Sequence, residues 1–326
     1  MIDRCGRNID YLRISVTDRC NLRCIYCMPE EGVKLVERAW ILQEEEIVRI
    51  CRVMAELGIS KIKLTGGEPL VRPGISELIK DIKKLPGIQK VTLTTNGVLL
   101  KEQMQALAEA GLDGLNISLD TLSSECYQEI ARRDYLEKAL EGMREALRYP
   151  EISVKVNCVP LGTEAQELWQ VAALAEKQPL HVRFIEMMPV GYGREFRGMT
   201  ETEVIRILEK RYGALIPYKG ERLGNGPCHY YEVSGFQGKI GFISAISHKF
   251  CKECNRIRLT SRGYLKTCLQ YTAGRDLCGI IRNGGTDEEL KDVIRAALEE
   301  KPEGHAFLEK APSDDTEKLC MSQIGG

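Results

Sequence analysis

The chain has 326 residues, of which 43% are hydrophobic and 29% charged, so it is long enough to bury a sizeable core. Its formal net charge is -1, which excludes a generally basic surface for nucleic acid or membrane, so any anionic ligand needs a local group of Lys and Arg. No apolar stretch reaches about 18 residues, and the first residues lack the apolar core of a signal peptide, so we expect a cytoplasmic protein without a membrane span. Thirteen cysteines in a reducing compartment favour metal or redox chemistry over disulfides.

Short apolar runs alternate with amphipathic helical patterns through the first two thirds of the chain. The strands that we predict are 11–16, 61–65, 90–95, 114–119, 152–159 and 180–185. The helices that we predict are 44–57, 75–85, 101–110, 124–149, 164–177 and 201–211. Six repeats of strand and helix indicate a parallel sheet with right-handed crossovers, and they are too few for a closed eight-stranded barrel. We therefore expect an α/β fold, an open (β/α)6 partial barrel of the TIM type.

The pattern changes after about Pro217. A Gly-rich polar segment at 219–227 predicts a loop, and short strands follow at 230–233 and 239–243. A helix is expected to begin near Thr286, because Thr286 and Glu289 have the spacing of a capping box. The sequence thus predicts a partial barrel at 1–217 and a smaller C-terminal α+β region at 218–326 that closes it.

Cys20, Cys24 and Cys27 follow the first predicted strand with C-x3-C-x2-C spacing. Thiolates are soft ligands that suit iron–sulfur clusters or zinc. A structural zinc site needs four protein ligands, and no fourth Cys or any His lies nearby in the sequence. Three thiolates on a cubane cluster would leave one iron open to hold a small molecule. An incomplete zinc site and unrelated free thiols are the alternatives.

Cys251 and Cys254 form a second group with Cys268. A C-x2-C pair also fits half of a zinc ribbon. The residues that follow Cys254 argue against zinc. On a strand, Arg256 and Arg258 point to the same face, so their two guanidinium groups are aimed at one anion beside the metal. The candidates for an additional ligand are Cys228, His229, His248 and Cys278.

Basic side chains also lie inside the short apolar strands. Each alone is more often a solvated charge, but buried cations need partners, so a set of them indicates an anionic ligand. A contact between Lys and a phosphate at 4 Å is worth about 1 kcal/mol in water and about 4 kcal/mol where the effective dielectric is near 20. Several such cations are therefore needed to hold an anionic ligand such as a phosphate group. The candidates inside the predicted strands are Arg13, Lys61, Lys63, Lys155 and Arg183.

Further candidates stand at the predicted carboxyl ends of strands, where ligands collect in parallel α/β folds. Gly66-Gly67-Glu68-Pro69 follows the second strand, and its glycines allow close backbone approach to a ligand, although a plain turn also fits. Thr94 and Ser118 end the third and fourth strands, where each also fits a turn or cap. Met188, beyond the sixth strand, also fits core packing.

The octet Cys20–Cys27, with an aromatic residue before its third cysteine, resembles the signature of the radical S-adenosylmethionine (SAM) superfamily. The C-x2-C-N-R-x-R-L stretch from Cys251, with a third cysteine beyond it, resembles the auxiliary-cluster motif of the GTP 3',8-cyclases of molybdenum cofactor biosynthesis. The resemblance extends from Arg13 to Gly326. It implies a lyase that converts GTP to (8S)-3',8-cyclo-7,8-dihydroguanosine 5'-triphosphate after a 5'-deoxyadenosyl radical abstracts the ribose C3' hydrogen.

The resemblance also implies cofactors, site residues and partners. It implies two [4Fe-4S] clusters with open irons, one on the first cysteine group for SAM and one on the second for guanine. The residues expected at SAM are Tyr26, Gly66, Gly67, Glu68, Ser118 and Met188. Those expected at GTP are Arg13, Lys61, Lys63, Thr94, Lys155, Arg183, Arg256 and Arg258, with the tail glycines Gly325 and Gly326 reaching the active site. The implied partners are a second copy in a homodimer, a low-potential donor such as flavodoxin or ferredoxin, and cyclic pyranopterin monophosphate synthase.

Two rival interpretations remain at this point. A peptide-modifying radical SAM enzyme with auxiliary clusters usually carries more C-terminal cysteines, and the paired arginines speak against it. A non-catalytic iron–sulfur or zinc protein would not need Gly66-Gly67-Glu68-Pro69 or basic residues inside strands. A fourth ligand from Cys228 or Cys278 at the second group would put guanine coordination in doubt.

Overall fold

One sheet of 12 strands organises the part of the chain that this computed structural model describes, residues 1–308 and 315–325. Its strands are β1 (Tyr11–Ser15), β2 (Lys61–Thr65), β3 (Lys90–Thr95), β4 (Gly114–Ser118), β5 (Ser153–Cys158), β6 (His181–Ile185), β7 (Ile216–Pro217), β8 (His229–Glu232), β9 (Ile240–Ile243), β10 (Arg256–Leu259), β11 (Tyr264–Lys266) and β12 (Gly274–Asp276). Their order in the sheet is β12-β11-β10-β1-β2-β3-β4-β5-β6-β9-β8-β7. Within the described residues no pairing joins β12 to β7, so the predicted open partial barrel is confirmed.

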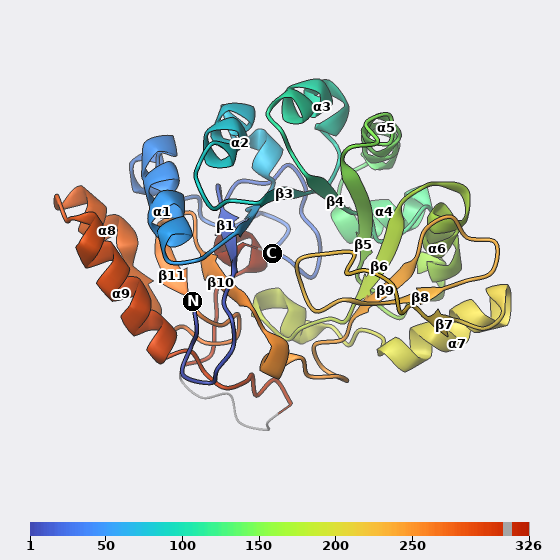
Figure 1. Ribbon diagram of the computed structural model, residues 1–326. Helices are drawn as coiled ribbons and strands as arrows, with labels where there is room; N and C mark the ends of the chain where they lie inside the picture. Colours follow the sequence, from blue (N-terminus) through green and yellow to red (C-terminus); the bar gives the residue numbers. More distant parts are fainter. Residues whose placement is uncertain (309–314, 326) are drawn as a thin grey trace.

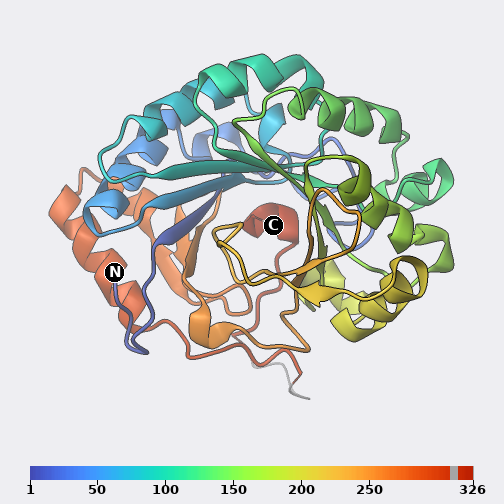
Figure 2. The ribbon, with the colours of Figure 1, turned by 45° about the vertical axis from the view of Figure 1, so that its right-hand side comes forward.

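Helices cover the outer side of this curved sheet, as Figures 1 and 2 show for α1, α2, α3 and α5. The helices are α1 (Glu44–Glu56), α2 (Ile75–Lys83), α3 (Leu100–Glu109), α4 (Ser124–Ala131), α5 (Leu136–Ala146), α6 (Leu168–Lys177), α7 (Glu201–Tyr212), α8 (Leu277–Arg282), α9 (Asp287–Glu299) and α10 (Met321–Ile324). The C-terminus lies inside the curve of the sheet in both views. Across the residues that the structure covers, no helix is long and apolar enough to cross a membrane.

Alternation along the parallel strands separates an apolar outer layer from a polar interior. Leu12 and Ile14 of β1 belong to the hydrophobic core that the helices cover, and neither is exposed to solvent. Arg13, between them, lines a cavity on the inner side of the sheet, as Lys63 of β2 does. The outer face of these strands is therefore apolar, and the inner face carries charged side chains toward the cavity.

Strands from the C-terminal part extend the sheet on both sides. β10 pairs in parallel with β1, with Arg258 opposite Arg13, and β9 pairs in parallel with β6. β11 and β8 continue the sheet as antiparallel neighbours of β10 and β9. Because strands from both sides of residue 217 share one sheet, the division into 1–217 and 218–326 stays a prediction.

The predicted helix 124–149 is wrong as a single helix, because α4 ends at Ala131 and α5 begins at Leu136. The backbone N–H groups of Arg23 and Ile25 donate to the carbonyls at the end of α4, at 3.0 and 2.9 Å. Arg132 then takes a left-handed conformation with φ 54° and donates a side-chain hydrogen bond to the carbonyl of Met28 at 3.2 Å. The helix ends where it supports the loop that carries the first cysteine group.

The predicted helix 164–177 also begins later than expected, at Leu168 in α6. A short 3-10 turn, Glu164–Gln166, precedes it. The Gln166 side chain is fully buried and donates to the carbonyls of Asp120 and Val159, at 3.0 and 2.7 Å. These bonds hold the segments that follow β4 and β5 together, which explains the irregular start.

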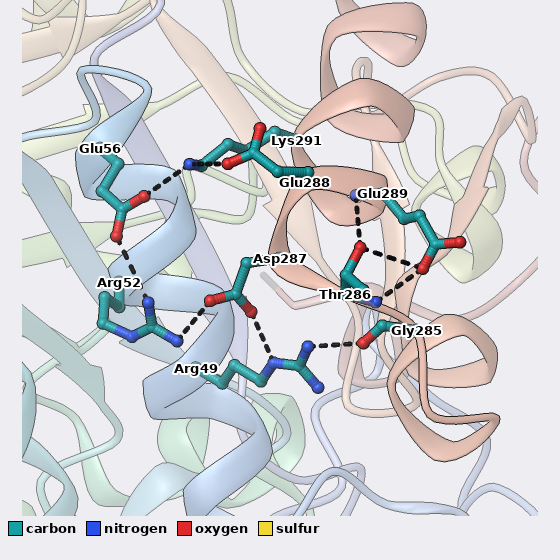
Figure 3. Close-up of polar contacts among 9 residues, drawn as sticks. All are labelled: Arg49, Arg52, Glu56, Gly285, Thr286, Asp287, Glu288, Glu289 and Lys291. Atoms are coloured by element: carbon teal, nitrogen blue, oxygen red, sulfur yellow. Dashed lines mark hydrogen bonds and ion pairs between the residues drawn. The ribbon is translucent and has the colours of Figure 1, made fainter.

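Helix α9 packs on α1 through ion pairs that Figure 3 shows. Asp287, at the start of α9, accepts from Arg49 Nε at 2.8 Å and from Arg52 Nη2 at 2.7 Å. Thr286 and Glu289 form the predicted capping box, which is confirmed. The N-terminus of α9 is thereby fixed to the partial barrel, next to the strands that carry the second cysteine group.

We expect Asp287→Ala to lower the free energy of unfolding by about 1 kcal/mol in urea denaturation at neutral pH, because both arginines lose their carboxylate. Arg49 and then Arg52 hold the pKa of Asp287 below its usual value. The contribution is therefore fully present above the unfolded pKa of about 3.9 and is lost as the pH falls through the lower folded pKa.

The matched control is Asp292→Ala on the same helix, where the carboxylate pairs with the exposed Arg295 at 3.0 Å and is itself 75% exposed. It should change stability by less than about 0.5 kcal/mol. Equal effects of the two substitutions would contradict the role assigned to Asp287.

Candidate active site

Both predicted cysteine groups line one cavity on the inner side of the sheet. The cavity is open to solvent, and its empty space of about 2230 Å³ includes part of that open solvent. The two cysteine groups therefore face one shared, solvent-accessible space.

The loop after β1 carries Cys20, Cys24 and Cys27 and lies against the turn after β2. Gly67 N–H donates to the Thr17 carbonyl at 2.8 Å, and a Cβ atom on Gly67 would lie 2.3 Å from the Arg19 carbonyl oxygen. Only glycine permits this approach, so a tight turn accounts for the glycine, and contact with SAM stays a prediction. Gly66, Gly67 and the three cysteines all line the cavity.

The thiols of the first group need a nearby cation to ionise. Burial, followed by repulsion from neighbouring cysteines, raises the pKa of Cys27 to about 12 and that of Cys24 well above its usual value. Burial and then Glu68 raise the pKa of Cys20 to about 11. Three soft donors on one loop that lines the cavity fit an iron–sulfur cluster, whose iron ions would supply the positive charge that the thiolates lack.

Two buried carboxylates organise the same end of the cavity. Glu68 accepts hydrogen bonds from Leu70 N at 3.0 Å, Thr95 Oγ1 at 2.7 Å and Asn96 N at 2.7 Å, and burial raises its pKa to about 7. Asp120 accepts from the predicted Tyr26 hydroxyl at 2.7 Å, and burial raises the pKa of Asp120 to about 6. These carboxylates hold the strand ends and the cysteine loop in one arrangement.

The second group comes from separate segments that meet at the cavity. Cys251 begins a 3-10 turn, Cys254 follows it, and Cys268 comes after β11. Burial opposes ionisation of Cys254, but the cations of Lys301 and Arg256 lower its pKa to about 7. This group therefore already has positive charge beside its sulfur atoms, and its three thiols also fit a cluster.

The four candidates for an additional ligand lie in different places. His229 Nε2 and His248 Nδ1 both contact Glu201, at 2.7 and 3.3 Å. Cys278 is buried on α8 and is not among the residues that line the cavity, whereas Cys228 lines it near Arg183. In the described part of the chain, no three His, Cys, Asp or Glu side chains are grouped to hold a single metal ion.

Cations gather at the end of the cavity that the second group occupies. The pKa of Lys63 lies well below its usual value because of burial and then repulsion by Arg183 and Arg13. The pKa of Arg258 is lowered by burial and then by Arg13 and Arg256. Buried like charges repel strongly, so this end of the cavity suits a highly charged anion. The predicted cations that line the cavity are Arg13, Lys63, Arg183, Arg256 and Arg258.

Two other predicted cations are placed differently. Lys61 does not line the cavity, and its Nζ forms an ion pair with Asp10 Oδ2 at 2.6 Å. Lys155 is buried and is not among the residues that line the cavity, and its Nζ donates to Ser153 Oγ at 2.6 Å. Burial and then Arg183 lower the pKa of Lys155 to about 8. Contacts of these two residues with a substrate stay predictions.

The remaining predicted residues mostly reach the cavity. Thr94, Ser118 and Met188 line it. Thr94 Oγ1 accepts from Asn116 Nδ2 at 3.3 Å, and the Asn116 oxygen accepts from Arg183 at 2.6 Å. The carbonyl of Gly325 accepts from Arg258 Nη1, so the tail enters the site, while Gly326 lies outside the described residues.

Several lining residues were not among the predicted site residues. Asn96 and Asp120 stand at strand ends, which is a usable signal, but both also fit a turn. Lys301 and His305 follow α9 without any motif. Both ring nitrogens of His305 are buried and have no hydrogen-bond partner among residues 1–308 and 315–325, and its backbone N–H contacts Cys251 Sγ at 3.5 Å.

Comparison with solved structures supports the architecture. SuiB from Streptococcus suis, crystallised with S-adenosylmethionine, superposes with a TM-score of 0.63 over 94% of this chain and 75% of that chain. The sequences are 17% identical, so the likeness shows the fold alone.

Comparison of sequences is more specific. Residues 14–175 match the radical SAM superfamily, and residues 180–307 match the family described as Molybdenum Cofactor Synthesis C. The GTP 3',8-cyclase of Clostridium perfringens strain SM101 is 46% identical over 327 residues, which cover 100% of both chains, and that of Pelotomaculum thermopropionicum is 44% identical with the same coverage. Molybdenum cofactor biosynthesis protein 1 of Dictyostelium discoideum is 40% identical over 94% of this chain and 50% of its own length. The chain therefore belongs to the GTP 3',8-cyclase family of radical SAM enzymes.

Proposed function

We propose that this chain converts GTP to (8S)-3',8-cyclo-7,8-dihydroguanosine 5'-triphosphate, the first step of molybdenum cofactor biosynthesis. The observation that carries the proposal is a cavity with buried cations and a group of three thiols at either end, in a chain of this family. Relatives that match over their full length favour this activity over peptide modification and over a non-catalytic scaffold.

As a radical SAM enzyme, the chain uses SAM and an iron–sulfur cluster, for which Cys20, Cys24 and Cys27 are the candidate ligands. When bound, this cluster supplies the electron that cleaves SAM to methionine and a 5'-deoxyadenosyl radical. A second [4Fe-4S] cluster on Cys251, Cys254 and Cys268 is our proposal. Their convergence at the other end of the cavity supports it.

The residues of the chain would then place the two ligands relative to each other. The Glu68 end, with Tyr26, Ser118 and Met188, receives SAM, and the cationic end receives the triphosphate and guanine. We infer that this holds the ribose C3' near the 5' carbon of SAM, and C8 of guanine within reach of C3'. Such positioning lowers the activation free energy, because binding has already met the entropy cost of bringing the reacting atoms together.

The tail contributes to closing the site. The Lys266 ammonium and the Glu317 carboxylate form a buried ion pair, which fixes the tail to β11. The chain continues from there to Gly325, whose carbonyl contacts Arg258. We infer that the tail excludes water and stray hydrogen donors from the radical.

We also infer the wider context from the family. The chain is expected to act in the cytoplasm as a homodimer. A flavodoxin or ferredoxin would supply the low-potential electron, and cyclic pyranopterin monophosphate synthase would take the product.

The radical route predicts transfer of a specific hydrogen. Reduced enzyme incubated anaerobically with SAM and C3'-deuterated GTP should place deuterium in 5'-deoxyadenosine, which mass spectrometry detects. GTP deuterated at another ribose carbon is the control and should give unlabelled 5'-deoxyadenosine. Unlabelled 5'-deoxyadenosine from the C3'-labelled substrate, with GTP unchanged, would contradict the proposal.

Lys61 and Lys63 lie on the same face of β2 by alternation, but the structure predicts different effects of their removal on the KM for GTP. Lys63→Ala should raise the KM for GTP at least about tenfold, a loss of roughly 1.4 kcal/mol, because a cation is lost from the cavity. Lys61→Ala should raise it by less than about threefold, a loss below roughly 0.7 kcal/mol, because Lys61 already pairs with Asp10.

Lys90→Ala, at the exposed start of β3, is the control for the loss of a lysine and should leave the KM unchanged. A larger effect at Lys61 than at Lys63 would show that the phosphates lie elsewhere.

A further inference from the structure

We propose that Lys301 is a positioning residue of the second metal site. Its ammonium joins the two segments that carry Cys254 and Cys268, and it stabilises the negative charge of the cluster bound there. The inference rests on the proposed function, because it presupposes the second cluster.

The ammonium of Lys301 is buried and fully engaged. The residue is 2% exposed, and its Nζ donates to the Arg256 carbonyl at 3.0 Å, to the Thr267 carbonyl and to Cys254 Sγ at 3.8 Å. A protonated lysine has three N–H donors, and here each has an acceptor. The surroundings thus match a charged lysine and orient it toward sulfur.

These contacts connect parts of the second group that are far apart in sequence. Arg256 stands two residues after Cys254, and Thr267 directly precedes Cys268. Lys301 itself follows α9, so one side chain ties both ligand segments to a third element. Without it, two carbonyls and a thiolate would lose their shared donor, and the spacing of the sulfur atoms would be less well fixed.

The residues that follow Lys301 in the chain also lie beside the second cysteine group. Arg7 Nη1 donates to the Cys251 carbonyl at 3.0 Å and to the Glu303 carbonyl at 2.9 Å. The backbone N–H of His305 donates to Cys251 Sγ at 3.5 Å. Residues 301–305 thus form a support for the cysteines that the cysteine motif itself does not contain.

The charge of Lys301 predicts an effect on reduction of the cluster. A [4Fe-4S] cluster with three thiolates is anionic, and one electron from a chemical reductant adds a further negative charge without breaking a bond. A fixed ammonium nearby stabilises the reduced state more than the oxidised one, because the attraction grows with the charge. Removing the ammonium should therefore lower the reduction potential of the second cluster.

The test uses the full-length chain, anaerobically reconstituted, with Cys20, Cys24 and Cys27 replaced by Ala so that only the second cluster gives a signal. Lys301→Met, Lys301→Arg and Lys252→Met are compared by iron and sulfide content and by a titanium(III) citrate titration monitored by electron paramagnetic resonance. Lys252 lies inside the same C-x2-C motif but is exposed, so it is the matched control for loss of a lysine charge.

We expect Lys301→Met to shift the ratio of reduced to oxidised cluster at least tenfold toward oxidised, which for one electron is about 59 mV. Lys301→Arg should keep the potential close to that of the chain with Lys301 intact, and Lys252→Met should cause no shift. Loss of iron in Lys301→Met that Lys301→Arg restores, with an unchanged circular dichroism spectrum, would also support the inference.

An unchanged potential and iron content in Lys301→Met would overturn the inference and leave the proposed function standing. Absence of iron from the second group with Lys301 intact would instead remove the proposed second cluster, and the inference with it.

Discussion

The parallel pairing of β1 with β2 and β10 is the constraint on which the site depends. Its register places Arg13 opposite both Lys63 and Arg258, so three cations lie side by side on the inner face of the sheet. The outer faces of the same strands carry Leu12 and its apolar neighbours, so the strands cannot turn over without exposing the core. The backbone therefore holds mutually repelling charges in place, and a bound anion would relieve the repulsion.

The same pairing brings the two cysteine groups into one cavity. The first group lies on the loop at the carboxyl end of β1, supported by the end of α4 and by the glycine turn after β2. The second group lies beside the neighbouring strands β10 and β11, supported by Lys301. Because β10 hydrogen-bonds directly to β1, the two groups are attached to neighbouring strands of one sheet. Such an arrangement suits catalysis by positioning, if each group holds a cluster as we propose.

The sequence alone allowed prediction of the features that depend on local pattern. Apolar periodicity identified the strands from β1 to β6, and spacing identified both cysteine groups. Alternation placed Lys61 and Lys63 on one face of β2. It does not show how far along the strand the cavity extends, so it could not show that Lys61 pairs with Asp10 instead of lining the cavity.

Features that depend on distant partners could not be predicted. The break after α4 exists because N–H groups from the cysteine loop, over 100 residues earlier in the chain, bond to its last carbonyls. No motif records that Lys301 contacts Cys254 or that His305 contacts Cys251. We propose that each group of three thiols holds a cluster with one iron left open for a ligand. Mössbauer spectroscopy of enzyme reconstituted with isotopically enriched iron distinguishes such a cluster from one with four protein ligands. We expect SAM to change the signal of one iron in the first cluster and GTP to change that of one iron in the second. Signals that neither ligand changes, or a fourth protein ligand on either cluster, would contradict it.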